Sequence, residues 1–227
     1  MKYTFVIPVV NDPRVIKAIN SFILCSGSYE SECLVVCNGS DTKFINSLVE
    51  RYDRHNNIRI VYTERKNIAL ARNIGVLLAK GDFLIFIDSD CIFDDRYLEV
   101  LTKIHNDQDV IRGKITYDIG ITSFDRNYAW LRTYFNNEFT TKLFTPNLVV
   151  RKSIFDTVGL YNELGVSEDT EWSQRFYENQ NYSAKYAPEL VVKHGTDNPK
   201  KATRTWMFYG LSLAYRARKT MLFQNQN

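Results

Sequence analysis

The chain has 227 residues, of which 44% are hydrophobic and 24% charged, and its formal net charge is +3 at pH 7. These values describe an ordinary globular protein large enough for one sizeable α/β domain, and the small net charge argues against a nucleic-acid-binding protein. No stretch approaches the roughly 18 apolar residues that span a bilayer, so no transmembrane helix is predicted.

The first residues enter an apolar strand at once, without the charged leader of a secretory signal. The four cysteines, Cys25, Cys33, Cys37 and Cys91, fall in apolar or strand-like segments that lack the paired spacing of a metal site. This pattern indicates reduced, buried thiols rather than a disulfide framework. We therefore expect a cytoplasmic protein.

Apolar strands and amphipathic helices alternate over the first part of the chain. Strands are predicted at 4–9, 33–37, 58–62 and 83–87, and helices at 13–25, near 44–49 and at 67–80. This alternation is typical of a parallel sheet wound with right-handed crossovers. It predicts an α/β fold with a mostly parallel central sheet flanked by helices.

The fourth predicted strand is an unbroken apolar run that begins after Gly81 and ends in Asp88-Ser89-Asp90. Such a run suits a central strand covered on both faces, and ligands bind at the carboxyl ends of these strands. If strand geometry persists, Asp88 and Asp90 lie on the same side and offer oxygen ligands to a divalent cation. The alternative is a turn that uses these carboxylates for backbone hydrogen bonds.

The pattern after Asp90 is less regular. A helix is predicted near 95–106, strands near 110–117 and 147–150, a helix over 168–179, and one or two short strands over 184–192 that end at His194. The segment 124–144 is rich in aromatic residues, which either pack in the core or line a carbohydrate site. These residues are Tyr128, Trp130, Tyr134, Phe135 and Phe139.

The end of the chain is basic and aromatic. From Lys193 onward, seven lysines and arginines stand against the single acidic residue Asp197. Residues 200–223 are predicted to form an amphipathic helix, which suits peripheral contact with a membrane surface or an anionic substrate. The alternative is a solvated helix face.

Seven stretches of the sequence, in order, resemble the family-2 glycosyltransferases with the GT-A fold. They read VIPVVN at 6–11, VVCNGSD at 35–41, NIALARNIG at 67–75, FIDSD at 86–90, NLVVR at 147–151, GLYNE at 159–163 and EDTEW at 168–172. Each is a weak signal alone, whereas their order and spacing together are specific. The resemblance implies a single GT-A-type, Rossmann-like domain over 1–195. Its nucleotide-sugar-binding half is about 1–92 and its acceptor-binding half about 93–195, followed by a helical tail over 196–227.

The resemblance also implies an activity. The family moves a sugar from a nucleoside diphosphate sugar to a hydroxyl of a glycan or lipid-linked glycan, with inversion at the anomeric carbon and with Mn²⁺ or Mg²⁺ as cofactor. It further suggests bacterial-type surface polysaccharide synthesis, which the basic tail would place at the inner face of the cell membrane.

Residue roles follow by the same resemblance. Asp169 is expected to take the proton of the acceptor hydroxyl, and Asp90 to ligate the metal directly, while Asp88 contacts the ribose or a metal-bound water. The donor is expected to contact Pro8, Val10, Asn11, Asn38, Arg72, Asp88 and Ser89. The metal is expected to be held by Asp88, Asp90 and His194. The acceptor side is expected to include Asn147, Glu168, Trp172 and Arg175.

Each role has a plain structural alternative. Glu168 and Asp169 at a helix start also suit capping and the helix dipole. Arg72 also reads as a surface cation on an amphipathic helix, and His194 as a structural histidine.

The turn after the second predicted strand departs from the family pattern. Relatives commonly carry two aspartates before Gly-Ser, where this chain has Cys37 and Asn38. An aspartate accepts a hydrogen bond from the uracil imide, whereas an amide offers both a donor and an acceptor. A UDP-sugar remains the favoured donor, and the base stays open.

Three other protein classes compete with this interpretation. A sugar-phosphate nucleotidyltransferase is disfavoured because no glycine-rich phosphate loop follows the first strand. A phosphatase that uses its first aspartate as nucleophile is disfavoured because the Asp88 segment lacks the expected hydroxyl residue. A non-catalytic nucleotide-sugar or glycan-binding module that keeps the fold is the remaining alternative.

Overall fold

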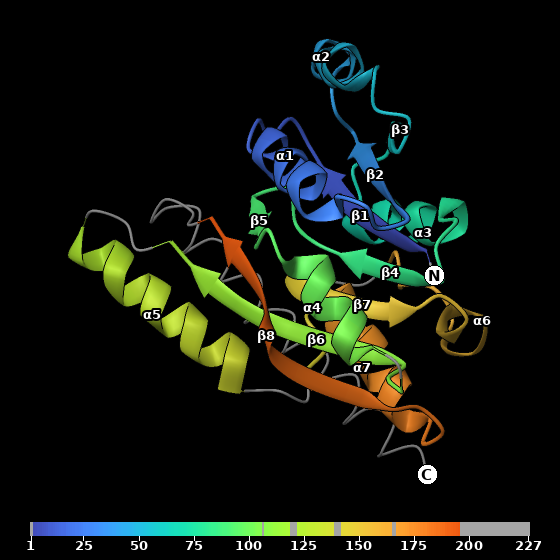
Figure 1. The fold of residues 1–227 in the computed structure, drawn as a ribbon, viewed down its shortest axis with the longest axis vertical. Coiled ribbons are helices and arrows are strands. Elements are labelled where there is room, and N and C mark those ends of the chain that lie inside the picture. Colours follow the sequence, from blue (N-terminus) through green and yellow to red (C-terminus); the bar gives the residue numbers. More distant parts are fainter. Residues whose placement is uncertain (1, 106, 119–121, 139–141, 165–166, 196–227) are drawn as a thin grey trace.

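The computed structural model describes the whole chain except residues 1, 106, 119–121, 139–141, 165–166 and 196–227 (Figure 1). Its described part is built on one eight-stranded sheet with the strand order β3-β2-β1-β4-β7-β6-β8-β5. The strands are β1 (Tyr3–Val9), β2 (Ser31–Asn38), β3 (Ile58–Thr63), β4 (Phe83–Phe86), β5 (Cys91–Phe93), β6 (Val110–Tyr117), β7 (Leu148–Arg151) and β8 (Ala184–His194). The helices are α1 (Val15–Ser26), α2 (Thr42–Tyr52), α3 (Ile68–Leu78), α4 (Tyr97–Ile104), α5 (Ser123–Glu138), α6 (Ile154–Val158) and α7 (Glu168–Glu178), with a 3-10 turn at Thr145–Asn147.

The first four strands pair in parallel, with β1 between β2 and β4 and with β3 outside β2. All seven residues of β1 are buried because helices cover both faces of the sheet. Alternate side chains point to opposite faces. Phe5 and Ile7 pack in the same cluster as Phe22 of α1, whereas Val6 packs in the cluster that contains Val76 of α3. The predicted α/β alternation is confirmed.

Gly75 sets how closely α3 packs on the sheet. A Cβ atom at this position would lie 2.3 Å from Cγ1 of Val6, which is closer than side chains tolerate. The absence of a side chain therefore lets α3 sit directly on β1. This contact brings the residues at the start of α3 close to the carboxyl ends of the strands.

The second half of the sheet is mixed. β7 is antiparallel to both β4 and β6, whereas β8 runs parallel to β6 and antiparallel to β5. The strands expected near 110–117 and 147–150 and the helix expected over 168–179 are confirmed as β6, β7 and α7. The segment 184–192, expected as one or two short strands, is one strand that follows β6 across an irregularity at Gly113/Lys114.

The elements β5, α5, α6 and the 3-10 turn were not predicted. Strand β5 has three residues and helix α6 has five, too few to show a hydrophobic period. The helix predicted over 200–223 and the side chains of Phe135 and Phe139 lie outside the description. Among the described residues, no helix has the length and apolar character needed to cross a membrane. The four cysteines are free and buried, as expected.

Candidate active site

A cavity of about 410 Å³ opens at the carboxyl ends of β1 and β2, beside the start of α3. This is the edge at which open α/β sheets bind their ligands. The cavity is lined by Pro8, Val9, Val10, Asp12, Asn38, Lys66, Asn67, Ile68 and Ser89. Four of the residues expected at the donor, Pro8, Val10, Asn38 and Ser89, therefore lie together.

Asn11 lies outside this lining and ties two loops together. Its backbone has a positive φ of 46°, and its Oδ1 accepts a hydrogen bond of 3.0 Å from the backbone nitrogen of Asp41. The Asn11 nitrogen in turn donates to Oγ of Ser40 at 3.3 Å. Asn11 thus fixes the loop after β1 against the loop after β2, a role that the sequence did not indicate.

The two carboxylates of the Asp-Ser-Asp motif converge on His194. Nε2 of His194 lies 3.7 Å from Oδ2 of Asp88 and 3.6 Å from Oδ1 of Asp90. The pairing of Cys91 with His194 across β5 and β8 brings the imidazole to this position. The expectation that strand geometry aligns the carboxylates is wrong, because β4 ends at Phe86 and a turn follows in which the Cys91 nitrogen donates to the Asp88 carbonyl.

The residues of this cluster suit a divalent cation. Ligand atoms of Asp90, Cys91 and His194 all lie within 4.8 Å of one another, and Asp88 approaches the same imidazole. Carboxylate oxygens and an imidazole nitrogen are ordinary ligands for such ions. Cys91 was expected only as a buried thiol; its position directly after Asp90 was the signal that it joins the cluster.

The electrostatics of the cluster favour charged groups. Burial opposes ionisation of Asp88, but its contacts with His194 and Arg72 outweigh burial and lower its pKa. Burial lowers the pKa of His194, but the hydrogen bond with Asp88 and the charges of both aspartates raise it above its ordinary value. The ring of Tyr117 stacks on the imidazole with centroids 4.9 Å apart. The two carboxylates therefore favour positive charge at the imidazole between them.

Arg14 is a further partner of Asp90 that the sequence did not reveal. Its Nη1 lies 2.9 Å from Oδ2 of Asp90, while its Nη2 pairs with Asp12 at 2.6 Å. Arg14 precedes α1, in the loop that follows β1. No motif marked it, because only the fold brings that loop beside the Asp-Ser-Asp turn.

Arg72 bridges two parts of the site. The side chain is 3% exposed, its Nη2 lies 3.1 Å from Oδ1 of Asp88, and its Nη1 forms an ion pair with Glu168 at the start of α7. Arg72 is not among the residues that line the cavity of about 410 Å³. The guanidinium holds both carboxylates, and the expected contact of Arg72 with the nucleotide stays a prediction.

Asp169 follows Glu168 in the first turn of α7. Its Oδ1 accepts a hydrogen bond of 2.7 Å from the backbone nitrogen of Thr170. Burial and the neighbouring carboxylate of Glu168 raise the pKa of Asp169 to about 6. Ser167, just before the helix, adopts the left-handed conformation with φ of 62° and makes no side-chain capping bond. Asp169 is thus a carboxylate with unusual basicity at the edge of the site.

Asn147 and Trp172, which were expected on the acceptor side, are both buried in the fold. Asn147 is buried, accepts a hydrogen bond from Oη of Tyr97 at 2.7 Å and donates to two backbone carbonyls. Trp172 is fully buried and donates to the carbonyl of Gly159 at 2.9 Å. Hydrogen bonds within the protein satisfy the polar atoms of both side chains. These residues shape the second half of the fold.

Arg175 likewise serves the fold. Its guanidinium pairs with Glu171 on the same helix and donates to the backbone carbonyls of Val158 and Leu160. These bonds anchor the loop after α6 to α7. In the same loop, the Tyr161 carbonyl and Oε1 of Glu163 accept hydrogen bonds from Nδ2 of Asn73 on α3. These bonds tie the loop to α3.

The aromatic residues of α5, expected either in the core or at a carbohydrate site, differ in their exposure. Trp130 and Tyr134 are 67% and 49% exposed, and their rings stack with centroids 5.6 Å apart. They are therefore not core residues. Tyr128 is half-buried.

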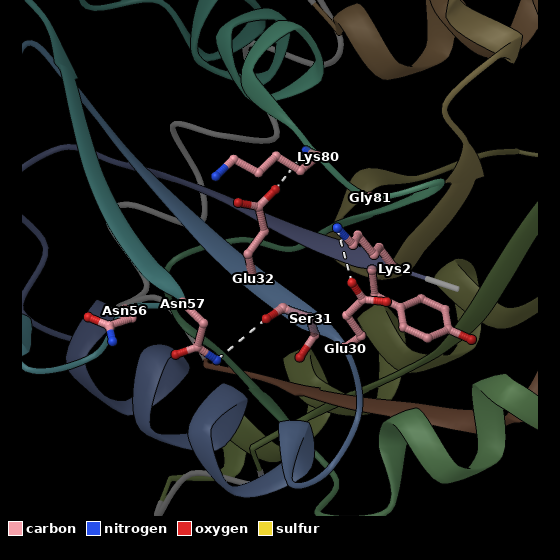
Figure 2. Close-up of a pocket in the computed structure, with 9 residues that line it drawn as sticks. Lys2, Glu30, Ser31, Glu32, Asn56, Asn57, Lys80 and Gly81 are labelled. Carbon is pink, nitrogen blue, oxygen red and sulfur yellow. Dashed lines mark hydrogen bonds and ion pairs between the residues drawn. The ribbon is translucent and has the colours of Figure 1, made fainter.

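A second cavity, of about 170 Å³, lies at the opposite, amino-terminal ends of β1 and β2. Figure 2 shows that both of its glutamates, Glu30 and Glu32, already have partners within the cavity lining. Lys2 pairs with Glu30 at 3.0 Å, and Oε1 of Glu32 accepts a hydrogen bond from the backbone nitrogen of Lys80 at 2.7 Å (Figure 2). This cavity is remote from the carboxylate cluster.

Comparison with known proteins adds independent findings. The family model described as Glycosyl transferase family 2 matches residues 4–158. The glycosyltransferase AglE of Haloferax volcanii is 27% identical over 201 residues, which are 83% of this chain and 65% of that protein. The glycosyltransferase GlyA of Streptococcus pneumoniae is 30% identical over 105 residues, which are 45% of this chain and 15% of that protein.

Solved structures agree on the fold. The crystal structure of S. aureus TarS 1–349 in complex with UDP-GlcNAc matches with a TM-score of 0.69 and 20% sequence identity, over 87% of this chain and 59% of that one. The complex of the same protein with UDP gives a TM-score of 0.68 at 19% identity, over 87% of this chain and 61% of that one. The chain spans less than two thirds of the length of these relatives. The expected α/β architecture is confirmed.

Proposed function

Because the chain belongs to glycosyl transferase family 2, we propose that it moves a sugar from a nucleoside diphosphate sugar to a hydroxyl of a glycan or lipid-linked glycan, with inversion at the anomeric carbon. One observation carries the proposal. The donor cavity, the Asp88–Asp90–His194 cluster and Asp169 meet at one edge of the sheet, and Arg72 joins the cluster to the start of α7.

The donor is proposed to lie along the ends of β1, β2 and β4. Ser89 lines the cavity and stands between Asp88 and Asp90, so a nucleoside in the cavity places its diphosphate beside the cluster. Support for a UDP-sugar comes from S. aureus TarS, a protein of similar fold that was crystallised with UDP-GlcNAc and with UDP.

Asp88, Asp90 and His194 are proposed to hold Mn²⁺ or Mg²⁺. The cation supplies a Lewis acid that neutralises the charge developing on the diphosphate leaving group. Asp90 also lies against two groups of this chain, since Arg14 pairs with one of its carboxylate oxygens and His194 lies near the other.

Asp169 is proposed to act as the general base. Its pKa of about 6 leaves it ionised at neutral pH, yet makes it a stronger base than an ordinary aspartate. The acceptor oxygen forms a bond to the anomeric carbon while the bond from that carbon to the diphosphate oxygen breaks. The hydroxyl proton passes to the Asp169 carboxylate. Attack from the face opposite the leaving group gives inversion.

We further propose that the reaction serves surface polysaccharide or glycolipid synthesis at the cytoplasmic face of a membrane. This part rests on the basic and aromatic composition of residues 200–223. Liposome flotation of the chain with and without residues 200–227 tests it. Loss of lipid binding on truncation is expected, and equal binding of both forms would overturn it.

The enzymatic proposal is tested by incubating the chain with a panel of nucleotide sugars and Mn²⁺ and measuring release of nucleoside diphosphate. Release that stops with EDTA and in the Asp90→Ala variant is expected. Asp94→Ala, which removes a neighbouring exposed carboxylate, is the control and should remain active. Donor binding without any release would instead support a non-catalytic binding module.

A further inference from the structure

The side chain of Asn38 presents an acceptor that the described residues leave unsatisfied. Asn38 is 3% exposed, its Oδ1 is buried without a hydrogen-bond partner in the described part of the chain, and the residue lines the donor cavity. A buried acceptor without a partner is costly and rare in folded proteins. We therefore infer that the Asn38 amide forms hydrogen bonds with a ligand bound in the cavity.

The position of Asn38 relative to the carboxylates indicates which part of the ligand it meets. Asn38 ends β2, which is separated from β4 by β1 alone. Neighbouring strands lie about 4.8 Å apart, so Asn38 stands roughly 10 Å along the sheet edge from the turn that carries Asp88 and Asp90. If the diphosphate lies at those carboxylates, as the proposed function requires, the nucleobase lies at Asn38.

The cavity is partly apolar at this end. Pro8, Val9 and Ile68 supply apolar surface for a flat ring. Gly39 has a positive φ of 75°, and a Cβ atom there would lie 2.8 Å from Cβ of Lys66. The backbone directly after Asn38 therefore lies against Lys66, which also lines the cavity.

The amide reads a base differently from a carboxylate. A carboxylate only accepts hydrogen bonds, whereas an amide accepts with its oxygen and donates with its nitrogen. Uracil presents an imide N–H beside a carbonyl, and cytosine presents a ring-nitrogen acceptor beside an amino donor. An amide can pair with either pattern, because rotating it by about 180° exchanges its oxygen and its nitrogen. Because Oδ1 of Asn38 has no partner in the described structure, turning the amide breaks no hydrogen bond at that oxygen.

We propose that Asn38 makes the donor site accept cytidine and uridine diphosphates alike, so that the chain does not discriminate between the two pyrimidine bases. This inference rests on the proposed function. It assigns the base specificity of the same site to one residue. An aspartate at this position would face the ring-nitrogen acceptor of cytosine with a second acceptor and would restore selection for uracil.

The test is isothermal titration calorimetry of UDP, CDP and GDP, each with Mn²⁺, against the wild-type chain. We expect the dissociation constants of UDP and CDP to agree within about threefold, with GDP measured for comparison. In Asn38→Asp, UDP binding should persist. CDP binding should weaken at least about tenfold, because the hydrogen bond to the ring nitrogen of cytosine is lost. Asn57→Asp makes the same change at the far end of the sheet and should leave both constants unaltered.

The outcomes separate the two proposals. Binding of UDP at least about tenfold tighter than CDP in the wild type would overturn the inference and leave the glycosyl-transfer proposal in place. Binding of no nucleoside diphosphate by the wild type would overturn both. The wild-type ratio decides the inference even if Asn38→Asp proves unstable.

Discussion

Nη2 of Arg72 on α3 lies 3.1 Å from Oδ1 of Asp88 at the end of the central strand, and the arginine side chain is 3% exposed. The same guanidinium pairs with Glu168, one residue before the proposed base. A single buried guanidinium thus joins the Asp88–Asp90 turn to the start of α7. Two segments 80 residues apart in the sequence, at Asp88 and Glu168, are held to one another by this group.

Removal of this cation should destabilise the protein strongly. Arg72→Leu leaves the carboxylates of Asp88 and Glu168 without their buried partner, which costs about 3–5 kcal/mol of unfolding free energy in comparable pairs. Chemical denaturation measures the loss. Arg65→Leu removes the exposed pair with Glu163 and, as a control, should cost less than about 1 kcal/mol. Equal losses in the two variants would contradict the bridging role.

The turnover of the chain should depend on pH through Asp169. The carboxylate is the active form of a general base, so kcat/KM should fall tenfold per pH unit below its pKa of about 6 and level off above it. A pH series of nucleoside diphosphate release measures this limb. A rate that stays constant down to pH 5 would show that another group takes the proton.

The same raised pKa predicts a stability change of defined sign. The folded state binds the Asp169 proton more tightly than the unfolded chain does, so the wild type loses stability as the pH rises from about 4 to about 6. Asp169→Asn cannot ionise and keeps an acceptor for the Thr170 N–H. Its melting temperature should exceed that of the wild type at pH 7.5 and approach it at pH 4. A lower melting temperature at pH 7.5 would contradict the assigned environment.

Close packing at Gly75 should be intolerant of a methyl group. Gly75→Ala places a Cβ atom within 2.3 Å of Val6 and forces α3 away from β1. Overpacking of this kind typically costs about 1–3 kcal/mol. Leu77→Ala truncates a side chain that is 68% exposed on the same helix and should change the unfolding free energy by no more than about 0.5 kcal/mol. Comparable effects in both variants would argue against the close contact.

The sequence was a good guide to the first half of the fold because its strands are covered on both faces. Runs such as Phe83–Phe86 are apolar throughout, and the helices between them carry a clear period. Strand β5 was missed because three residues carry no period. It matters nevertheless, because its pairing with β8 sets His194 beside Asp88 and Asp90.

The site was predictable in its types of residue and less so in their contacts. Asp88, Asp90 and His194 meet as the family resemblance implied. By contrast, the burial of Arg72, Asn147 and Trp172 depends on partners far away in the chain, which no local pattern records. For the same reason Arg14 had no recognisable signal, since its partner Asp90 is reached only through the fold.

In the proposed mechanism, Asp169 takes the proton of the acceptor hydroxyl while the Asp88–Asp90 turn holds the donor. The most direct test is the rate of nucleoside diphosphate release by Asp169→Asn at saturating donor and Mn²⁺, with the donor dissociation constant measured on the same protein. We expect a rate at least about 100-fold below that of the wild type with donor affinity unchanged, because this is the usual effect of losing a general base. A variant that keeps the wild-type rate would contradict it.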